Sequence, residues 1–398
     1  MKTIKKYSNC IVEYLFQLFL MKILLSFISP LLESLGISST GTVTLALYFI
    51  MLIRFFVIVC RYSRIQISDI IILLIFYSVF ILNYVLFPDT RPYFLSQEMV
   101  MNYLMFLPIC VIGITKIDTW DVFFELGAKY SYAGAIVACL IFVFNLIGGL
   151  NYMEFSYSIL ALGGIAAINA SQRYKMIDIA TLVLYFLIII SYGARSPILL
   201  LACVFVAGVL FNEQRTKTLI FSAAIILCLS LAFSTGLFEN LLLRIFSDTG
   251  SYAILRILNG TFFQSNERNA LYEAANSYIV NMGLSINGLF GDRELSMQFG
   301  QPYIHNVVYE ILFSFGWIIG LFIIAVFLFK CLRILFKCKN NERLVFLYAL
   351  FALFGRYLLS GSFVVEWRFY IFVALMTALQ RGRKMTLKIG NIKLTNRD

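Results

Sequence analysis

The residue with the clearest potential for chemistry is His305, the only histidine in the 398-residue chain. It follows Pro302, which suits the first turn of a helix, and it opens a long apolar segment. The positive end of a helix dipole disfavours imidazolium, so the ring would stay neutral and could accept a proton near pH 7. The alternative is an interfacial histidine that only hydrogen-bonds to water. His305 is therefore a candidate general base with a structural alternative.

Arg195 lies in a short turn, Gly193-Ala194-Arg195-Ser196-Pro197, between two apolar segments. Ser196 suits an N-cap and Pro197 the first residue of the next helix. An arginine beside the free N–H groups of a helix start makes an anion site suited to phosphate. The alternative is an arginine that extends to lipid headgroups.

Arg268 begins a stretch with helical periodicity. Ser265 is a candidate N-cap, Gly283 is a candidate stop, and the apolar stripe between them comprises Leu271, Ala274, Ala275, Tyr278, Ile279 and Met282. At helical spacing, Arg268 falls on the edge of this stripe. We therefore expect it to point toward the rest of the protein and away from bulk water.

Other ionisable residues are weaker candidates. Arg356, Glu366 and Arg368 lie near the ends of the last two apolar segments, where a structural Arg–Glu pair is the favoured explanation. Asp292 and Glu294 have the D-x-E spacing of a Mg²⁺ or Mn²⁺ site, but no second carboxylate motif accompanies them. We expect no metal and no cofactor.

The elements that position these residues are predicted to be membrane spans. Hydrophobic residues make up 61% of the chain and charged residues 13%, against about 25% charged in soluble domains. Apolar runs long enough to cross a bilayer recur, so we predict an all-α polytopic membrane protein of about 12 transmembrane helices. The expected spans are 10–29, 41–60, 68–87, 98–115, 128–150, 156–171, 176–193, 197–211, 218–236, 304–328, 344–360 and 364–380.

The distribution of lysine and arginine predicts the orientation. Most of the 32 basic residues fall in alternate loops, on the side that includes both termini. By the positive-inside rule both termini are cytoplasmic. The chain then divides into nine spans over 1–236, a large, partly helical outside loop over 237–303, three spans over 304–380 and a basic cytoplasmic tail over 381–398. Arg256 lies in that loop, on a second apolar stretch expected along the bilayer surface. Nothing in the composition indicates nucleic-acid binding.

Four motifs in order resemble the bacterial O-antigen polymerase and ligase superfamily. They are Arg268-Asn269-Ala270-Leu271-Tyr272-Glu273-Ala274-Ala275, Gly288-Leu289-Phe290-Gly291, the segment from His305-Asn306 through Tyr309-Glu310 to Leu312, and Phe315-Gly316. Arg195 also matches a family arginine. Detailed similarity covers about 193–320. Tyr309 departs from the leucine of many members, and the Gly288–Gly291 turn is looser than the usual one.

The resemblance implies a membrane-embedded glycosyltransferase of C-type architecture in the bacterial inner membrane, acting at the periplasmic face. Its donor and acceptor would be glycans on undecaprenyl diphosphate, held in membrane lipid. His305 would be the base, and Arg195 and Arg268 would stabilise the leaving diphosphate in a metal-independent, inverting reaction. The implied substrate-binding candidates are Asn306, Glu310, Arg256, Arg293, Arg356 and Arg368. A flippase and a chain-length regulator are implied partners.

Two other functions remain open. An O-antigen ligase would share the site and chemistry but use lipid A core as acceptor. A flippase for lipid-linked oligosaccharides would place its functional residues near the midplane between two similar halves, and we find no convincing internal repeat.

Overall fold

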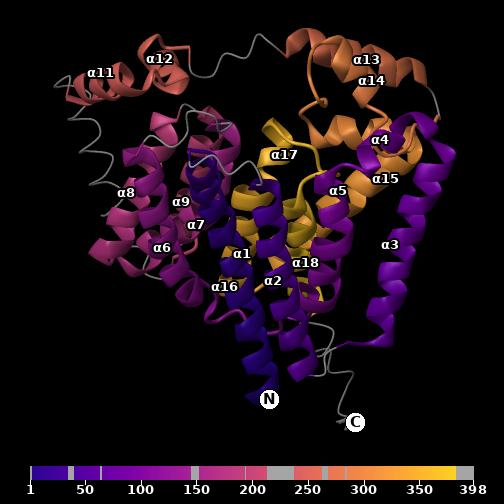
Figure 1. Cartoon of the computed structure of the whole chain (residues 1–398), viewed down its shortest axis with the longest axis horizontal. Helices are drawn as coiled ribbons and strands as arrows, with labels where there is room; N and C mark the ends of the chain where they lie inside the picture. Colours follow the sequence, from indigo (N-terminus) through magenta and orange to yellow (C-terminus); the bar gives the residue numbers. More distant parts are fainter. Residues whose placement is uncertain are drawn as a thin grey trace.

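A computed structural model describes residues 2–34, 40–62, 65–144, 152–192, 194–212, 237–261, 268–282 and 285–381. Every regular element in these ranges is helical (Figure 1). Seven helical segments are long and apolar enough to cross a membrane, and α8 (Met176–Ser191) and α9 (Arg195–Leu210) are shorter apolar helices. The predicted all-α polytopic membrane protein is confirmed at this level. The finer count of about 12 spans is not established.

The helices of the bundle follow the order of the expected spans. They are α1 (Lys2–Ser34), α2 (Thr40–Arg61), α3 (Ile67–Leu86), α6 (Phe123–Val143), α7 (Tyr152–Arg173), α8, α9, α15 (Val307–Lys337), α16 (Asn340–Tyr348), α17 (Arg356–Leu359) and α18 (Trp367–Arg381). The expected span 218–236, the tail after Arg381, and the expected cap Ser265 and stop Gly283 lie outside the described residues.

Two expected spans are interrupted helices. The segment expected at 98–115 begins, after the short α4 (Arg91–Phe94), as α5 (Gln97–Met101) and continues through π-helical turns at Asn102–Phe106 and Ile109–Gly113. The segment expected at 344–360 is divided into α16, a π-helical stretch at Ala349–Phe354, and α17. Single π-turns of this kind are frequent at functional sites.

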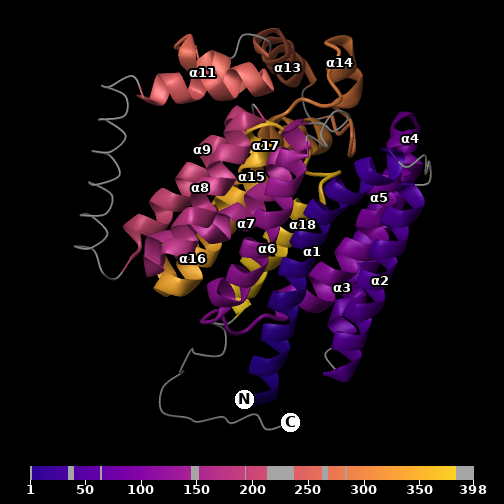
Figure 2. The same ribbon diagram turned by 60° about the vertical axis from the view of Figure 1, so that its left-hand side comes forward.

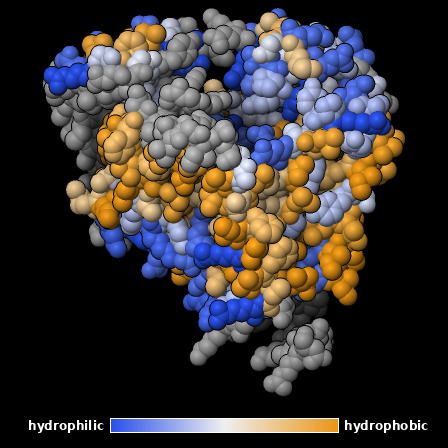
Figure 3. Space-filling model, viewed as in Figure 1, coloured by the Kyte–Doolittle hydropathy of each residue, from blue (hydrophilic) through white to orange (hydrophobic). Residues whose placement is uncertain are grey.

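The core of the bundle is α7, whose small residues let neighbouring helices approach closely. A Cβ added at Gly163 would meet the ring of Tyr185 on α8 at 3.3 Å, and one at Gly164 would meet Tyr348 on α16 at 3.0 Å. Small residues at helix contacts allow this packing in membranes. By contrast, α2 and α3 expose leucine, isoleucine and phenylalanine side chains. Hydrophobic residues cover much of the middle of the surface and the face along α3, and hydrophilic ones gather toward both ends (Figure 3).

The outer segment, residues 237–306, covers the end of the bundle opposite the start of α1. Its helices are α11 (Leu237–Thr249), α12 (Tyr252–Leu258), α13 (Asn269–Met282) and α14 (Arg293–Gln298) (Figures 1 and 2). The face predicted for α13 is confirmed, because Leu271, Ala275 and Ile279 pack with Phe313 of α15. The Trp317 indole also donates to the Ile279 carbonyl at 2.8 Å. This docking places the start of α13 over the bundle.

Candidate functional site

His305 lies just before α15. The sequence suggested a position in the first turn of that helix, and this expectation is wrong. Asn306 is the N-cap, and its Oδ1 accepts from the Val308 amide at 2.9 Å. His305 has φ of 62°, a left-handed conformation that is costly for a residue with a side chain. The preceding residue is held in place, since the Ile304 amide donates to Asp292 Oδ2 at 3.1 Å. The neighbouring structure therefore imposes a strained backbone on the sole histidine.

The imidazole has one engaged and one unengaged nitrogen. Nε2 lies 2.8 Å from Gln301 Oε1, and this amide oxygen can only accept, so Nε2 carries the proton. Nδ1 is then an acceptor, and within the described part of the chain it has no hydrogen-bond partner. The Tyr303 ring packs against the imidazole with centroids 4.3 Å apart. In this tautomer Nδ1 is buried and keeps a lone pair that can receive a proton.

The positive charges of three arginines act on the imidazole ring. Burial, followed by the charges of Arg268, Arg293 and Arg356, lowers the pKa of His305 from 6.5 to about 3. The side chain is only 7% exposed. The ring is therefore neutral at physiological pH, and the main causes are desolvation and neighbouring cations. A cationic site of this kind favours a bound anion.

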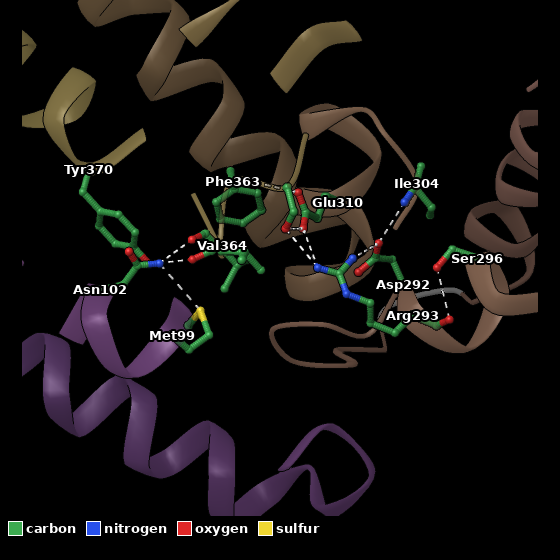
Figure 4. A network of polar contacts seen from close by, with 12 residues as sticks. Met99, Asn102, Asp292, Arg293, Ser296, Ile304, Glu310, Phe363, Val364 and Tyr370 are labelled. Carbon is green, nitrogen blue, oxygen red and sulfur yellow. Dashed lines mark hydrogen bonds and ion pairs between the residues drawn. The ribbon is translucent and has the colours of Figure 1, made fainter. Parts of the chain in front are cut away.

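Arg293 belongs to a buried ionic network (Figure 4). Its Nη1 lies 2.8 Å from Asp292 Oδ2, and its Nη2 lies 3.6 Å from Glu310 Oε1 and 3.0 Å from the Ser362 hydroxyl. Glu310 also accepts from the Ser362 hydroxyl and, at 2.9 Å, from the Phe363 amide. Arg293 and Glu310, both expected at a substrate, are thus engaged in joining the outer segment to α15 and the turn before α18.

Arg268 is held differently. It lies immediately before α13 and is partly buried, and its Nη1 donates to the Leu359 carbonyl at the end of α17. This contact bears out the expectation that Arg268 points toward the bundle. No carboxylate in the described ranges pairs with it. Within those ranges its positive charge is therefore not neutralised by an ion pair.

Arg195 is placed differently from the sequence interpretation. α9 begins at Arg195 with Ala194 as N-cap, so Ser196 is not the cap and Pro197 is the third helical residue. Ser196 lies beside the Tyr157 hydroxyl, and the Tyr157 ring lies 4.6 Å below the Arg356 guanidinium. Arg195 is not among the cations that depress the pKa of His305. The start of α9 is therefore linked to the site indirectly, because Ser196 lies beside Tyr157 and the Tyr157 ring contacts Arg356.

The other arginine candidates fall in three places. Arg356 pairs with Glu366 at 2.5 Å, which is the Arg–Glu pair expected from the sequence. Arg368 is 3% exposed and donates to the Ser158 hydroxyl at 3.2 Å. Arg256 lies on α12, which packs on α8 and lies away from α13 and α14 (Figure 1). Only Arg356 of these three acts electrostatically on His305.

The D-x-E pair does not form a shared site. Asp292 is fully buried between Arg293 and Ile304, whereas Glu294 is exposed. Burial raises the pKa of Asp292, against the opposing charge of Arg293. Within the described ranges, no cluster of three or more His, Cys, Asp or Glu side chains could hold a metal ion.

Sequence reasoning missed two residues of the site, Gln301 and Tyr303. Gln301 fixes the tautomer of His305, and Tyr303 lies between the imidazole and the Arg293 guanidinium, 5.4 Å from the latter. The available signal was their position within four residues of the only histidine.

Comparison with known proteins adds no identification: no family model, curated protein or solved structure matches the chain.

Proposed function

We propose that this protein is a metal-independent glycosyltransferase that polymerises oligosaccharide units carried on undecaprenyl diphosphate. The observation that carries the proposal is the His305 site. A buried, neutral imidazole has Nε2 bound to Gln301 and, among the described residues, no hydrogen-bond partner at Nδ1, and the charges of three arginines act on it. This arrangement combines a proton acceptor with an anion-binding field, which glycosyl transfer from a diphosphate requires.

In the proposed reaction, the acceptor hydroxyl oxygen attacks the anomeric carbon of the donor sugar. Nδ1 of His305 receives the hydroxyl proton as the new C–O bond forms. The bond from the sugar to the diphosphate breaks, and its electron pair stays on the diphosphate oxygen. Arg268 and Arg356 stabilise that charge, and attack on the face opposite the leaving group inverts the anomeric centre.

The lowered pKa of His305 gives the donor a second role. An imidazole whose pKa is lowered to about 3, by burial first and then by the charges of Arg268, Arg293 and Arg356, is a weak base before the donor binds. A bound diphosphate would offset those charges and raise the pKa of His305 toward the range in which it accepts a proton efficiently. In this proposal, donor binding activates the base.

The proposal includes the finer topology. We place the protein in the bacterial inner membrane with about 12 spans, both termini in the cytoplasm and the outer segment in the periplasm. Two features support this placement: the alternation of basic loops, and the position of α11–α14 at the end of the bundle opposite the start of α1 (Figure 2). Flippase and chain-length-regulator partners are part of the same proposal.

The test uses purified protein in lipid nanodiscs, supplied with lipid-diphosphate repeat units. His305→Asn keeps a residue that tolerates positive φ and should lower the rate of chain extension by about 10²–10⁴-fold. Arg268→Ala should lower the rate by about 10²-fold or more, through loss of leaving-group stabilisation. Glu273→Gln, on the exposed face of α13, is the matched control. Full extension by His305→Asn would remove the proposed base. Transfer only to lipid A core would indicate a ligase, and movement of labelled lipid without lengthening would indicate a flippase.

A further inference from the structure

A polar cavity lies in the bundle, and none of the residues that line it is His305 or one of the side chains in contact with its ring. Its volume is about 400 Å³, and it is lined by residues of α1, α2, α5, α7 and the start of α18. Five of its lining residues are acidic or basic: Lys22, Glu98, Glu154, Glu366 and Arg368. We call this cavity the charged chamber. Ionisable groups in membrane helices are costly, and they usually line a pathway or a binding site.

The charges of the chamber nearly balance. Lys22 and Glu154 form an ion pair at 2.8 Å, and Glu366 is paired with Arg356 at 2.5 Å. Arg368 and Glu98 supply one further charge of each sign. A chamber of this composition does not favour a highly charged anion such as a diphosphate. It contrasts with the surroundings of His305, where the charges of Arg268, Arg293 and Arg356 lower the pKa of the imidazole.

The chamber presents groups suited to a neutral, hydroxyl-rich ligand. Carboxylates of Glu98 and Glu154 can accept from hydroxyl groups, and the amide of Gln97 and the ammonium of Lys22 can donate to them. Trp367 also lines the chamber, but it is 9% exposed and its ring stacks on Phe106 with centroids 4.7 Å apart, so the polar groups carry the match to a ligand. A volume of about 400 Å³ lies in the range of small-ligand sites. A saccharide matches this combination of volume and hydrogen-bonding groups.

One ion pair links the chamber to the surroundings of His305. Glu366 lines the chamber, and its partner Arg356 is one of the cations acting on His305. Tyr303, in contact with His305, also experiences the charges of both Arg356 and Glu366. A ligand in the chamber would thus contact one member of an ion pair whose other member acts on the base.

We propose that the charged chamber binds the saccharide of the acceptor, while the diphosphate of the donor binds on the arginine side of His305. The acceptor assignment rests on the proposed function, but saccharide binding by the chamber does not, and it can be measured without any transfer reaction. A lipid headgroup carrying glycerol phosphate is the competing occupant, which the test distinguishes.

The decisive variants fill the chamber without removing a charge. Gly41 lines it, and a Cβ built at Gly41 meets no atom within 4 Å, so larger side chains can enter the open space. The series Gly41→Ala, Gly41→Leu and Gly41→Trp should progressively exclude a ligand. Glu98→Gln tests the chemistry separately, because Glu98 is exposed to the chamber and its replacement conserves shape. Glu273→Gln on the surface of α13 is again the control.

The probe is the oligosaccharide released by mild acid from the lipid-linked pool of the producing cells, with binding followed calorimetrically in nanodiscs. We expect affinity to fall about tenfold for Glu98→Gln, which corresponds to about 1.4 kcal/mol, and by more than tenfold for Gly41→Trp. His305→Asn should bind like the wild type. In chain extension, Glu98→Gln should raise the acceptor KM more than it lowers kcat, whereas His305→Asn should lower kcat.

Unchanged oligosaccharide binding by both Gly41→Trp and Glu98→Gln would overturn the chamber assignment. So would absence of oligosaccharide binding by the wild type, or binding of glycerol phosphate that Gly41→Trp removes while the oligosaccharide is unaffected. If the wild type binds the oligosaccharide through the chamber but extends no chain, the proposed function fails while the saccharide site stands. If the wild type extends chains but its oligosaccharide binding does not depend on the chamber, the saccharide site fails while the proposed function stands.

Discussion

Two arginines of the outer segment act on His305, and their surroundings are opposite. Arg293 is 4% exposed and lies between Asp292 and Glu310, with a further bond to Ser362. Arg268 is partly buried and donates to the Leu359 carbonyl. A buried cation with two carboxylates has little charge left for a ligand. An arginine bound to a neutral carbonyl retains its positive charge for one.

Arg268 and Arg293 lie in the same expected outside loop, and the difference in their contacts gives them separate roles. Arg293 joins three segments that are distant in the chain, since Glu310 lies on α15 and Ser362 precedes α18. Its contacts determine where Ile304 and hence His305 lie, because Asp292 also binds the Ile304 amide. We therefore assign Arg293 to positioning of the base and Arg268 to binding of the anion.

The largest effect is expected from Arg293→Met. The substitution leaves the buried carboxylates of Asp292 and Glu310 without their cation, and breaking a buried ion pair costs about 3–5 kcal/mol. The thermal unfolding temperature in detergent should fall substantially. Arg268→Ala, the matched arginine variant, should change it little because only one hydrogen bond to a carbonyl is lost. Equal unfolding temperatures for Arg293→Met and the wild type would contradict the division of roles.

Sequence reasoning reached the parts of the fold that depend on local pattern. The periodicity of residues 268–282 predicted the buried face of α13 and the inward direction of Arg268, and the proximity of Arg356 and Glu366 predicted their pair. These features need only helical geometry and nearby charges. The positions of α1–α3 likewise follow from the length of apolar runs.

The parts that failed depend on contacts between distant segments. The sequence suggests Arg293 as a substrate-binding candidate, whereas contacts with Glu310 and Ser362, distant in the chain, place it in a buried ionic network. His305 was expected within the helix, but Asn306 competes successfully as the cap and leaves His305 in a left-handed conformation. The N-cap of α9 is Ala194 and not the expected Ser196, and no side-chain hydrogen bond at the cap explains this difference.

The second prediction concerns the titration of His305, which gives a single histidine NMR signal in labelled protein. The folded pKa of about 3 lies below the ordinary 6.5, so the unfolded state binds more protons between these values. The contribution of His305 to stability is thus fully present above pH 6.5 and is lost as pH falls toward 3. Arg268→Ala should raise the pKa of His305, and so should inorganic pyrophosphate bound to the wild type. A histidine signal that titrates near pH 6.5 in the free wild-type protein would refute this electrostatic account.

The smallest effect is expected from Tyr309→Phe, which tests which contacts hold α13, and with it Arg268, in position. Tyr309 stacks on Tyr272 of α13 with ring centroids 5.5 Å apart, and its hydroxyl donates to Asn276 Oδ1 at 2.8 Å. Phenylalanine keeps the stacking and loses one exposed hydrogen bond, so the unfolding free energy should fall by about 1 kcal/mol or less. Chain extension should stay within about twofold of the wild type, because the buried contacts of Leu271 and Ile279 continue to hold α13. Tyr309→Leu removes the stacking as well and is the graded comparison. If Tyr309→Phe alone reduced extension as strongly as Arg268→Ala, the position of Arg268 would depend on this hydrogen bond and not on the apolar face of α13.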